Sequence, residues 1–290
     1  MLSDINGSQT TIKQKGDEFM NSTCKTKVYG WIVTGSFLLM IIINALANIL
    51  PINGVTTGDV SNSYANLFAP AAFTFTIWGA IYFLLGLYIL YQWGLLDKDK
   101  NKLKKSLIQK ISIPFIISSI SNFFWIFAWH YNAIFISLIL MIIILICLIF
   151  INLIIKKEKL TKKEWFFISV PFSVYFGWIT IATVANITTW LVSIGWNGFG
   201  ISEAVWTVFI LLVAVGIGLS VVWRYKDIVY GLVFIWAYIG ILSKHFAPTG
   251  FAGQYVGVIA AVIVSLVLLI SVQGFLIIND MKEFFVKKLR

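Results

Sequence analysis

Residues 133–155 read AIFISLILMIIILICLIFINLII, a run without a single charged side chain. About 20 consecutive apolar residues allow an α-helix to cross the hydrocarbon core of a bilayer. This stretch therefore predicts a transmembrane helix and decides the class of the protein. The rest of the sequence agrees with it, because 59% of the 290 residues are hydrophobic and only 12% are charged, about half the charged share of a soluble domain.

Working outward from this run, comparable apolar stretches alternate with short segments of charged or turn-forming residues. They predict an all-α, polytopic helical membrane protein with about eight spans. The seventh stretch is the shortest. The expected spans occupy residues 29–50, 69–93, 108–129, 133–155, 165–190, 203–223, 228–243 and 255–278.

Lysine and arginine residues are distributed unevenly over the connections between these spans. Of the 22 cations, 21 fall in the N-terminal segment, in alternate connections or in the C-terminal tail, and Lys244 is the exception. Cationic segments stay preferentially on the cytoplasmic side, so this pattern predicts that both termini are cytoplasmic. The net charge of +10 then indicates membrane orientation and attraction to anionic lipid, and not a nucleic-acid-binding surface.

Residues typical of catalysis are missing from the expected spans. The chain has two cysteines and no HExxH or GxSxG motif, and its carboxylates lie outside the predicted bilayer centre, which argues against an enzyme, a metal site and an ion-coupled transporter. At the outer face, Glu203 and Lys244 with His245 are placed where they could pair, as surface structure or as a gate.

Three spans carry polar and aromatic residues at helical spacing, so that each presents one stripe. Indole N–H and amide groups are costly in lipid, so the stripes should face one another. They could pack the helices together or line a pocket for a ligand. The stripes are Ala71, Phe75, Trp78, Tyr82 and Gly86 in the second span, Ser118, Asn122, Trp125 and Trp129 in the third, and Tyr175, Trp178, Ala182, Ala185 and Asn186 in the fifth.

Most of the 12 tryptophans fall at span ends, where an aromatic belt at the headgroup level is the expected role. Glycine pairs suggest close helix contacts within one chain or in a homodimer. The belt candidates are Trp31, Trp93, Trp129, Trp165, Trp190, Trp196 and Trp223, and the glycine pairs are Gly253 with Gly257 and Gly216 with Gly218.

The striped spans resemble the TspO/MBR family of translocator proteins, in particular its longer tryptophan-rich sensory branch. The resembling stretches are FAPAAFTFTIWGAIYFLLGLYILYQW at 68–93, SISNFFWIFAW at 119–129 and VPFSVYFGWITIATVANITTWL at 170–191. The resemblance covers residues 29–191 and implies a TspO-like five-helix core. The chain is then divided into a polar cytoplasmic segment 1–28, this core, three additional spans within 192–278 and a basic cytoplasmic tail 279–290.

The resemblance implies a pocket for a planar apolar ligand such as a tetrapyrrole, in a sensor or a carrier. No His, Cys or Met is expected near the stripes, so a porphyrin-type ligand would be held by stacking, with no cofactor. The alternatives are a permease for a small neutral solute and a tetrapyrrole-modifying enzyme. The ligand-binding candidates are Phe75, Trp78, Tyr82, Asn122, Trp125, Tyr175, Trp178, Ala182 and Asn186.

The cation composition also bears on the source of the chain. Arginine occurs at only two positions, Arg224 and Arg290, and every other cation is lysine. Together with abundant isoleucine this favours an AT-rich genome and a bacterial plasma membrane, where the partners would be the lipid bilayer and an apolar small molecule.

Overall fold

A computed structural model of the chain describes residues 27–96 and 105–289, with side chains to residue 282. Every regular element in these ranges is helical, and eight helices are long and apolar enough to cross a membrane. The prediction of eight spans is confirmed, and the seventh is longer than expected. The spans are Lys27–Ile49, Ala72–Gln92, Lys105–His130, Ile134–Lys156, Lys162–Ser193, Glu203–Tyr225, Ile228–Phe246 and Val256–Lys282.

Several spans combine more than one helical element, and short helices cap their connections. The second span joins η2 (Ala72–Thr76) to α3 (Ile77–Gln92), and the fifth joins α6 (Lys162–Glu164), the π-helical η4 (Trp165–Ser169) and α7 (Val170–Ser193). The first span, Lys27–Ile49, is a single helix, and the remaining spans are α4 (Lys105–His130), α5 (Ile134–Lys156), α8 (Glu203–Tyr225), α9 (Ile228–Phe246) and α10 (Val256–Leu289). The short helices are η1 (Ile52–Gly54), α2 (Thr57–Ser63) and η5 (Gly198–Gly200).

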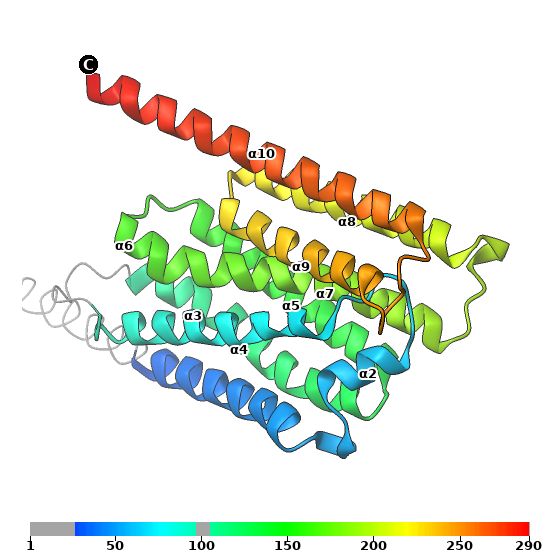
Figure 1. Ribbon diagram of the computed structural model, residues 1–290. Coiled ribbons are helices and arrows are strands. Elements are labelled where there is room, and N and C mark those ends of the chain that lie inside the picture. Colours follow the sequence, from blue (N-terminus) through cyan, green and yellow to red (C-terminus); the bar gives the residue numbers. More distant parts are fainter. Residues whose placement is uncertain (1–26, 97–104, 290) are drawn as a thin grey trace, which may run out of the picture.

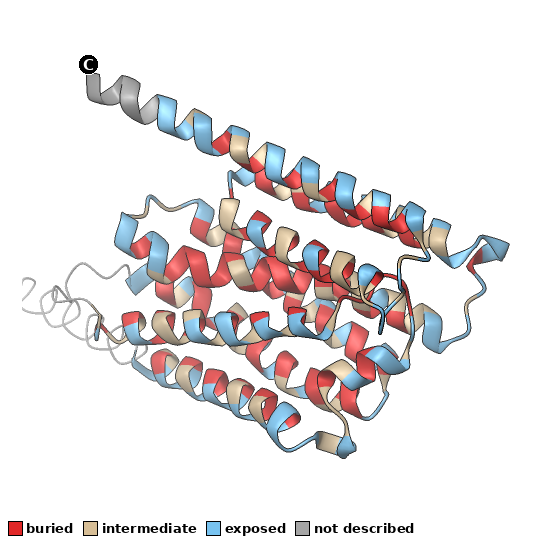
Figure 2. Cartoon of the chain, viewed as in Figure 1, coloured by how far each residue is buried: buried red, intermediate tan, exposed pale blue. Residues whose placement is uncertain are grey.

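Helix α7 is the centre of the bundle. It packs against α3, α5 and α9, and buried residues line most of its length (Figure 2). Helix α10 packs against α8 and α9 on the side of the bundle opposite the first span (top in Figure 1). The five-span part and the three additional spans therefore meet mainly along α7 and α9.

The two ends of the bundle differ in charge. One end carries the ion pairs Lys110–Glu158 at 3.7 Å, Lys156–Asp227 at 3.0 Å and Lys226–Asp280 at 3.6 Å. We call it the inner end, because the cation pattern predicts that it faces the cytoplasm. The opposite, outer end holds α2 and the connections that lead into α8 and α10 (right in Figure 1). Predicted segment 1–28 and the connection at 97–104 lie almost entirely outside the described residues.

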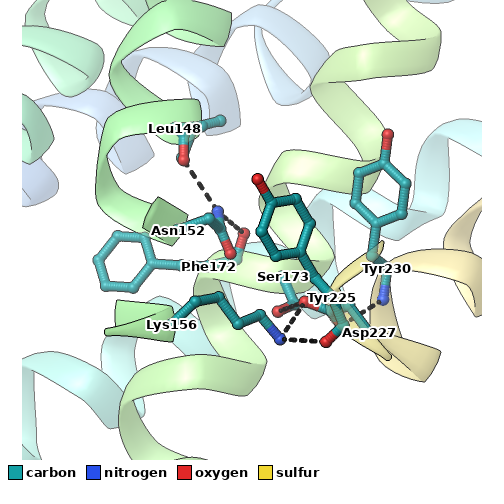
Figure 3. Close-up of polar contacts among 8 residues, drawn as sticks. All are labelled: Leu148, Asn152, Lys156, Phe172, Ser173, Tyr225, Asp227 and Tyr230. Carbon is teal, nitrogen blue, oxygen red and sulfur yellow. Dashed lines mark hydrogen bonds and ion pairs between the residues drawn. The ribbon is translucent and has the colours of Figure 1, made fainter. Parts of the chain in front are cut away.

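At the inner end, a buried carboxylate fastens the additional spans to the five-span part (Figure 3). Asp227 begins α9 and accepts a hydrogen bond from the Tyr230 N–H at 3.1 Å. It also accepts one from the Ser173 hydroxyl of α7 at 2.8 Å and pairs with Lys156 of α5. One side chain, 6% exposed, thus ties together α5, α7 and the start of α9.

Of the two glycine pairs, one includes a residue outside any helix and the other includes a residue at a close helix contact. The expectation of a helical GxxxG motif at Gly253 and Gly257 is wrong, because Gly253 has φ +77° in the turn that precedes α10. Gly218 of α8 does mark a close contact, since a Cβ there would lie 2.6 Å from the Phe234 ring of α9. This glycine serves packing within the chain, and the homodimer stays a prediction.

Candidate aromatic binding site

Trp78 of α3 lies at the centre of a cluster of aromatic rings near the outer half of the bundle. It stacks on Tyr82 with ring centroids 5.5 Å apart. Ring centroids of Tyr175 and Trp178 on α7 lie 6.1 Å from it, and that of Trp125 on α4 lies at 6.4 Å. The stripes of the second, third and fifth spans therefore meet at this one indole.

Two hydrogen-bonded amides surround the ring cluster. Asn122 donates to the Tyr175 hydroxyl at 3.4 Å and accepts from the Asn44 side chain of the first span at 2.7 Å. Asn186 accepts from the Trp125 indole at 3.2 Å and donates to the Ser137 hydroxyl of α5 at 3.0 Å. Both amides join helices, and their partners fix the orientation of the rings.

A small cavity of about 50 Å³ lies between these rings and the outer end. We call it the inner cavity because it lies among the helices of the five-span part; the name does not refer to the inner end of the bundle. Of the residues predicted for the site, the structure brings Phe75, Trp78, Trp125, Trp178, Ala182 and Asn186 to its wall. Asn122 and Tyr175 lie behind the wall, fully buried. The inner cavity is far below the roughly 300–1,000 Å³ of typical small-molecule sites.

A second, larger cavity of about 460 Å³ lies between the first span and α3; we call it the lateral cavity. It is lined by Asn44 and Asn48 on one side and by Tyr82 on the other. Phe75 and Trp78 line both cavities. Thr57 of α2 lines both as well, so the Phe75 and Trp78 rings together with Thr57 form the partition between the lateral and the inner cavity.

Helix α2 and the chain that follows it cover the outer side of the inner cavity. Thr56 and Asp59 form a capping box at the start of α2, and the Thr56 hydrogen bonds hold the pKa of Asp59 below its ordinary value. The Trp129 indole donates to the Thr57 carbonyl at 3.1 Å. Thr57, Ser61 and Asn66 from this cover line the cavity.

The additional spans hold this cover in place. The Leu67 N–H donates to the Glu203 carboxylate of α8 at 3.1 Å, and the Leu67 carbonyl lies 2.9 Å from the His245 ring of α9. Lys244 donates to the Asn62 side chain at 3.1 Å. The expectation that Glu203 and Lys244 could pair is wrong, because Glu203 binds Leu67 in the connection that follows α2, and Lys244 binds Asn62 in the last turn of α2.

Two residues of the site differ from the expectations of the sequence. Trp129 was assigned to the aromatic belt, yet it is 5% exposed and lines the inner cavity. Met141 of α5 also lines this cavity, so the expectation that no methionine lies near the stripes is wrong. The stripe that includes Trp129 was a signal for its burial, whereas the charge-free α5 run offered no periodicity that would single out Met141.

Two polar groups of the ring cluster have no hydrogen-bond partner among the described residues. The Trp178 side chain is 3% exposed, and its indole nitrogen is buried without a hydrogen-bond partner. The hydroxyl of Tyr82, which lines the lateral cavity, is unpartnered as well. An unsatisfied buried donor costs about 1–3 kcal/mol, so each is a position where the acceptor of a ligand would be stabilised.

The inner cavity is lined by aromatic rings, aliphatic groups, hydroxyls and amides, and none of the described residues that line it is titratable. Such a wall stacks on flat rings and orients them through single hydrogen bonds.

Comparison with known proteins agrees with this architecture. No curated protein and no solved structure matches the chain. A model of the TSPO-like protein family matches residues 30–273, which extends beyond the five spans of the sequence resemblance into α8, α9 and most of α10. With an aromatic core inside a helical membrane bundle and a match over most of its length, the chain belongs to the TSPO-like protein family.

Proposed function

We propose that the protein binds a flat apolar ligand with at least one hydrogen-bond acceptor, of the tetrapyrrole type, between α3, α4 and α7. The observation that carries the proposal is the unpartnered indole nitrogen of Trp178. It lies in a ring cluster whose amides Asn122 and Asn186 already have partners. A ligand acceptor at this nitrogen would replace a missing hydrogen bond without disturbing the others.

The cavity volumes support a route from the membrane side. The inner cavity is too small for a tetrapyrrole, whereas the lateral cavity of about 460 Å³ is in the range of small-molecule sites. Rotation of Phe75 and Trp78 would join the two. We therefore propose that the ligand enters between the first span and α3 and displaces this partition.

The physiological role that fits such binding is a sensor or a carrier in a bacterial plasma membrane, with both termini in the cytoplasm. Bound tetrapyrrole would be held by stacking and by the Trp178 N–H, without a resident cofactor. Met141 adds a polarizable thioether to the wall, which favours contact with aromatic rings.

The replacement Trp178→Phe tests the proposed site. It keeps an aromatic ring and removes the unpartnered donor, so we expect protoporphyrin IX to bind about three- to tenfold more weakly, the value of one hydrogen bond. The measurement is a titration of detergent-purified protein followed by the shift of the porphyrin's own absorbance band. This signal comes from the ligand and does not depend on the number of tryptophans.

The matched control is Trp223→Phe. Its indole is 59% exposed and lies in the last turn of α8, a helix that contributes no residue to the ring cluster. Binding by this variant should equal that of the parent. Equal affinities of the parent and Trp178→Phe, or porphyrin uptake that does not saturate, would contradict the proposed site. A permease for small neutral solutes would then be the better explanation.

A further inference from the structure

A third cavity lies at the outer end, between α7 and the start of α8. Its volume is about 180 Å³, and the connection at 194–202 forms one of its walls. Thr188 of α7 and Thr207 of α8 line it, and Asn66 lines both this cavity and the inner cavity. None of the aromatic residues of the ring cluster lines it, so it is a separate site.

Two indoles line this outer cavity. The ring centroids of Trp196 and Trp206 are 5.0 Å apart and the rings are tilted by 58°. The Trp206 indole donates to the Gly198 carbonyl at 2.7 Å. A Cβ at Gly198, which has φ +63°, would lie 2.8 Å from the Trp206 ring, so only glycine lets the connection fold this closely over the indole.

The outer cavity also contains a carboxylate, that of Glu203. One of its oxygens accepts the hydrogen bond from the Leu67 N–H. No ion pair between described residues includes Glu203, and the nearby cation Lys244 is directed to Asn62 instead. The cavity therefore combines a negative charge with two aromatic rings and lacks an internal cation.

We propose that this outer cavity binds an organic ammonium group, held by the faces of Trp196 and Trp206 and by the Glu203 carboxylate. Cations bind over indole faces because the ring quadrupole is negative there, and trimethylammonium ligands are commonly recognised by such aromatic walls. A volume of about 180 Å³ accommodates a head of this size but not a tetrapyrrole.

The ammonium group has two sources. It is either a free amine on the outer side of the membrane or the choline or ethanolamine head of a lipid in the outer leaflet, since the cavity lies at the outer ends of two spans. The same chemistry serves both, and the test separates them.

The test uses choline and its neutral isostere 3,3-dimethylbutan-1-ol with the full-length protein in deuterated detergent. Binding is measured by saturation transfer from protein to the ligand methyl protons. We expect saturable binding of choline and little binding of the isostere. Glu203→Gln, which keeps an acceptor for the Leu67 N–H, and Trp196→Leu should each weaken choline binding roughly fivefold or more.

Two control variants complete the design. Asp59→Asn removes the same charge from another exposed carboxylate of the outer end, and Trp223→Leu removes an exposed indole; both should bind choline like the parent. In nanodiscs, loss of choline binding with phosphatidylcholine but not with phosphatidylglycerol identifies a lipid head, and equal binding in both identifies a free amine.

Equal signals from choline and its isostere would overturn the proposal, as would unchanged choline binding in both Glu203→Gln and Trp196→Leu. Protoporphyrin binding by the parent and by Trp178→Phe, measured on the same preparations, tests the ring cluster independently of the outer cavity. The ammonium site fails alone if porphyrin still binds in a Trp178-dependent way while choline does not, and the porphyrin site fails alone in the reverse case.

Discussion

Replacing Asp227 with alanine is expected to lower the free energy of unfolding by about 3 kcal/mol. The carboxylate is 6% exposed and pairs with Lys156 at 3.0 Å, and removing one partner of a buried pair costs about 3–5 kcal/mol. The lysine side chain is 26% exposed, so water offsets part of its loss. The variant also loses the cap of α9 at the Tyr230 N–H, which is worth about 1 kcal/mol.

The measurement is unfolding by SDS from mild-detergent micelles, followed by tryptophan fluorescence. The control is Asp280→Ala, because that carboxylate is half exposed and its pair with Lys226 spans 3.6 Å; its loss should cost at most about 1 kcal/mol. Asp227→Asn, which keeps a capping oxygen, should fall between the two. If Asp227→Ala and Asp280→Ala are equally stable, the carboxylate does not fasten the additional spans.

Replacing Gly240 with leucine is expected to weaken porphyrin binding by more than tenfold and to destabilise the protein by about 1–3 kcal/mol, the usual cost of overpacking. A Cβ at Gly240 of α9 would collide with the Thr74 side chain of η2, which is fully buried. The Ala71 N–H also donates to the Gly240 carbonyl at 3.0 Å, and Trp236 donates to the Thr74 carbonyl at 3.0 Å. The two elements therefore have no room to separate without breaking these hydrogen bonds.

The effect on binding follows because η2 carries Phe75, one of the residues that separate the two cavities. Pushing η2 away from α9 moves this ring relative to Trp178, whose centroid lies 6.0 Å away. The control is Gly216→Leu on α8, where a Cβ meets nothing within 4 Å, and the readouts are the porphyrin titration and SDS unfolding. Parent-like binding by Gly240→Leu would show that the additional spans do not position the site.

Much of the fold was predictable because it depends on local composition. A charge-free run such as 133–155 has to become a helix in lipid, since no other local structure satisfies its backbone groups there. The stripe that contains Trp78 and Tyr82 was also predictable, because residues four apart share a helix face. These features need no knowledge of neighbouring helices.

The sequence-based predictions that were wrong share a different cause. The position of Trp129 near a span end favoured the aromatic belt, but α2 folds back over that end and buries the ring. Glu203 and Lys244 were placed at the outer face where they could pair, yet Glu203 binds Leu67 after α2 and Lys244 binds Asn62 within α2. In both cases a segment distant in sequence changed the surroundings of the residue.

The number of spans, the polar-aromatic stripes of three of them and the charge difference between the ends were predictable from the sequence alone. These follow from hydropathy and from the geometry of a single helix, which are properties of consecutive residues. The buried N–H of Trp178 without a partner, the separation of two cavities by the Phe75 and Trp78 rings, and the anchoring of the cover by α8 and α9 became visible only in the folded bundle. These features depend on contacts between helices that are distant in sequence, which no local pattern records.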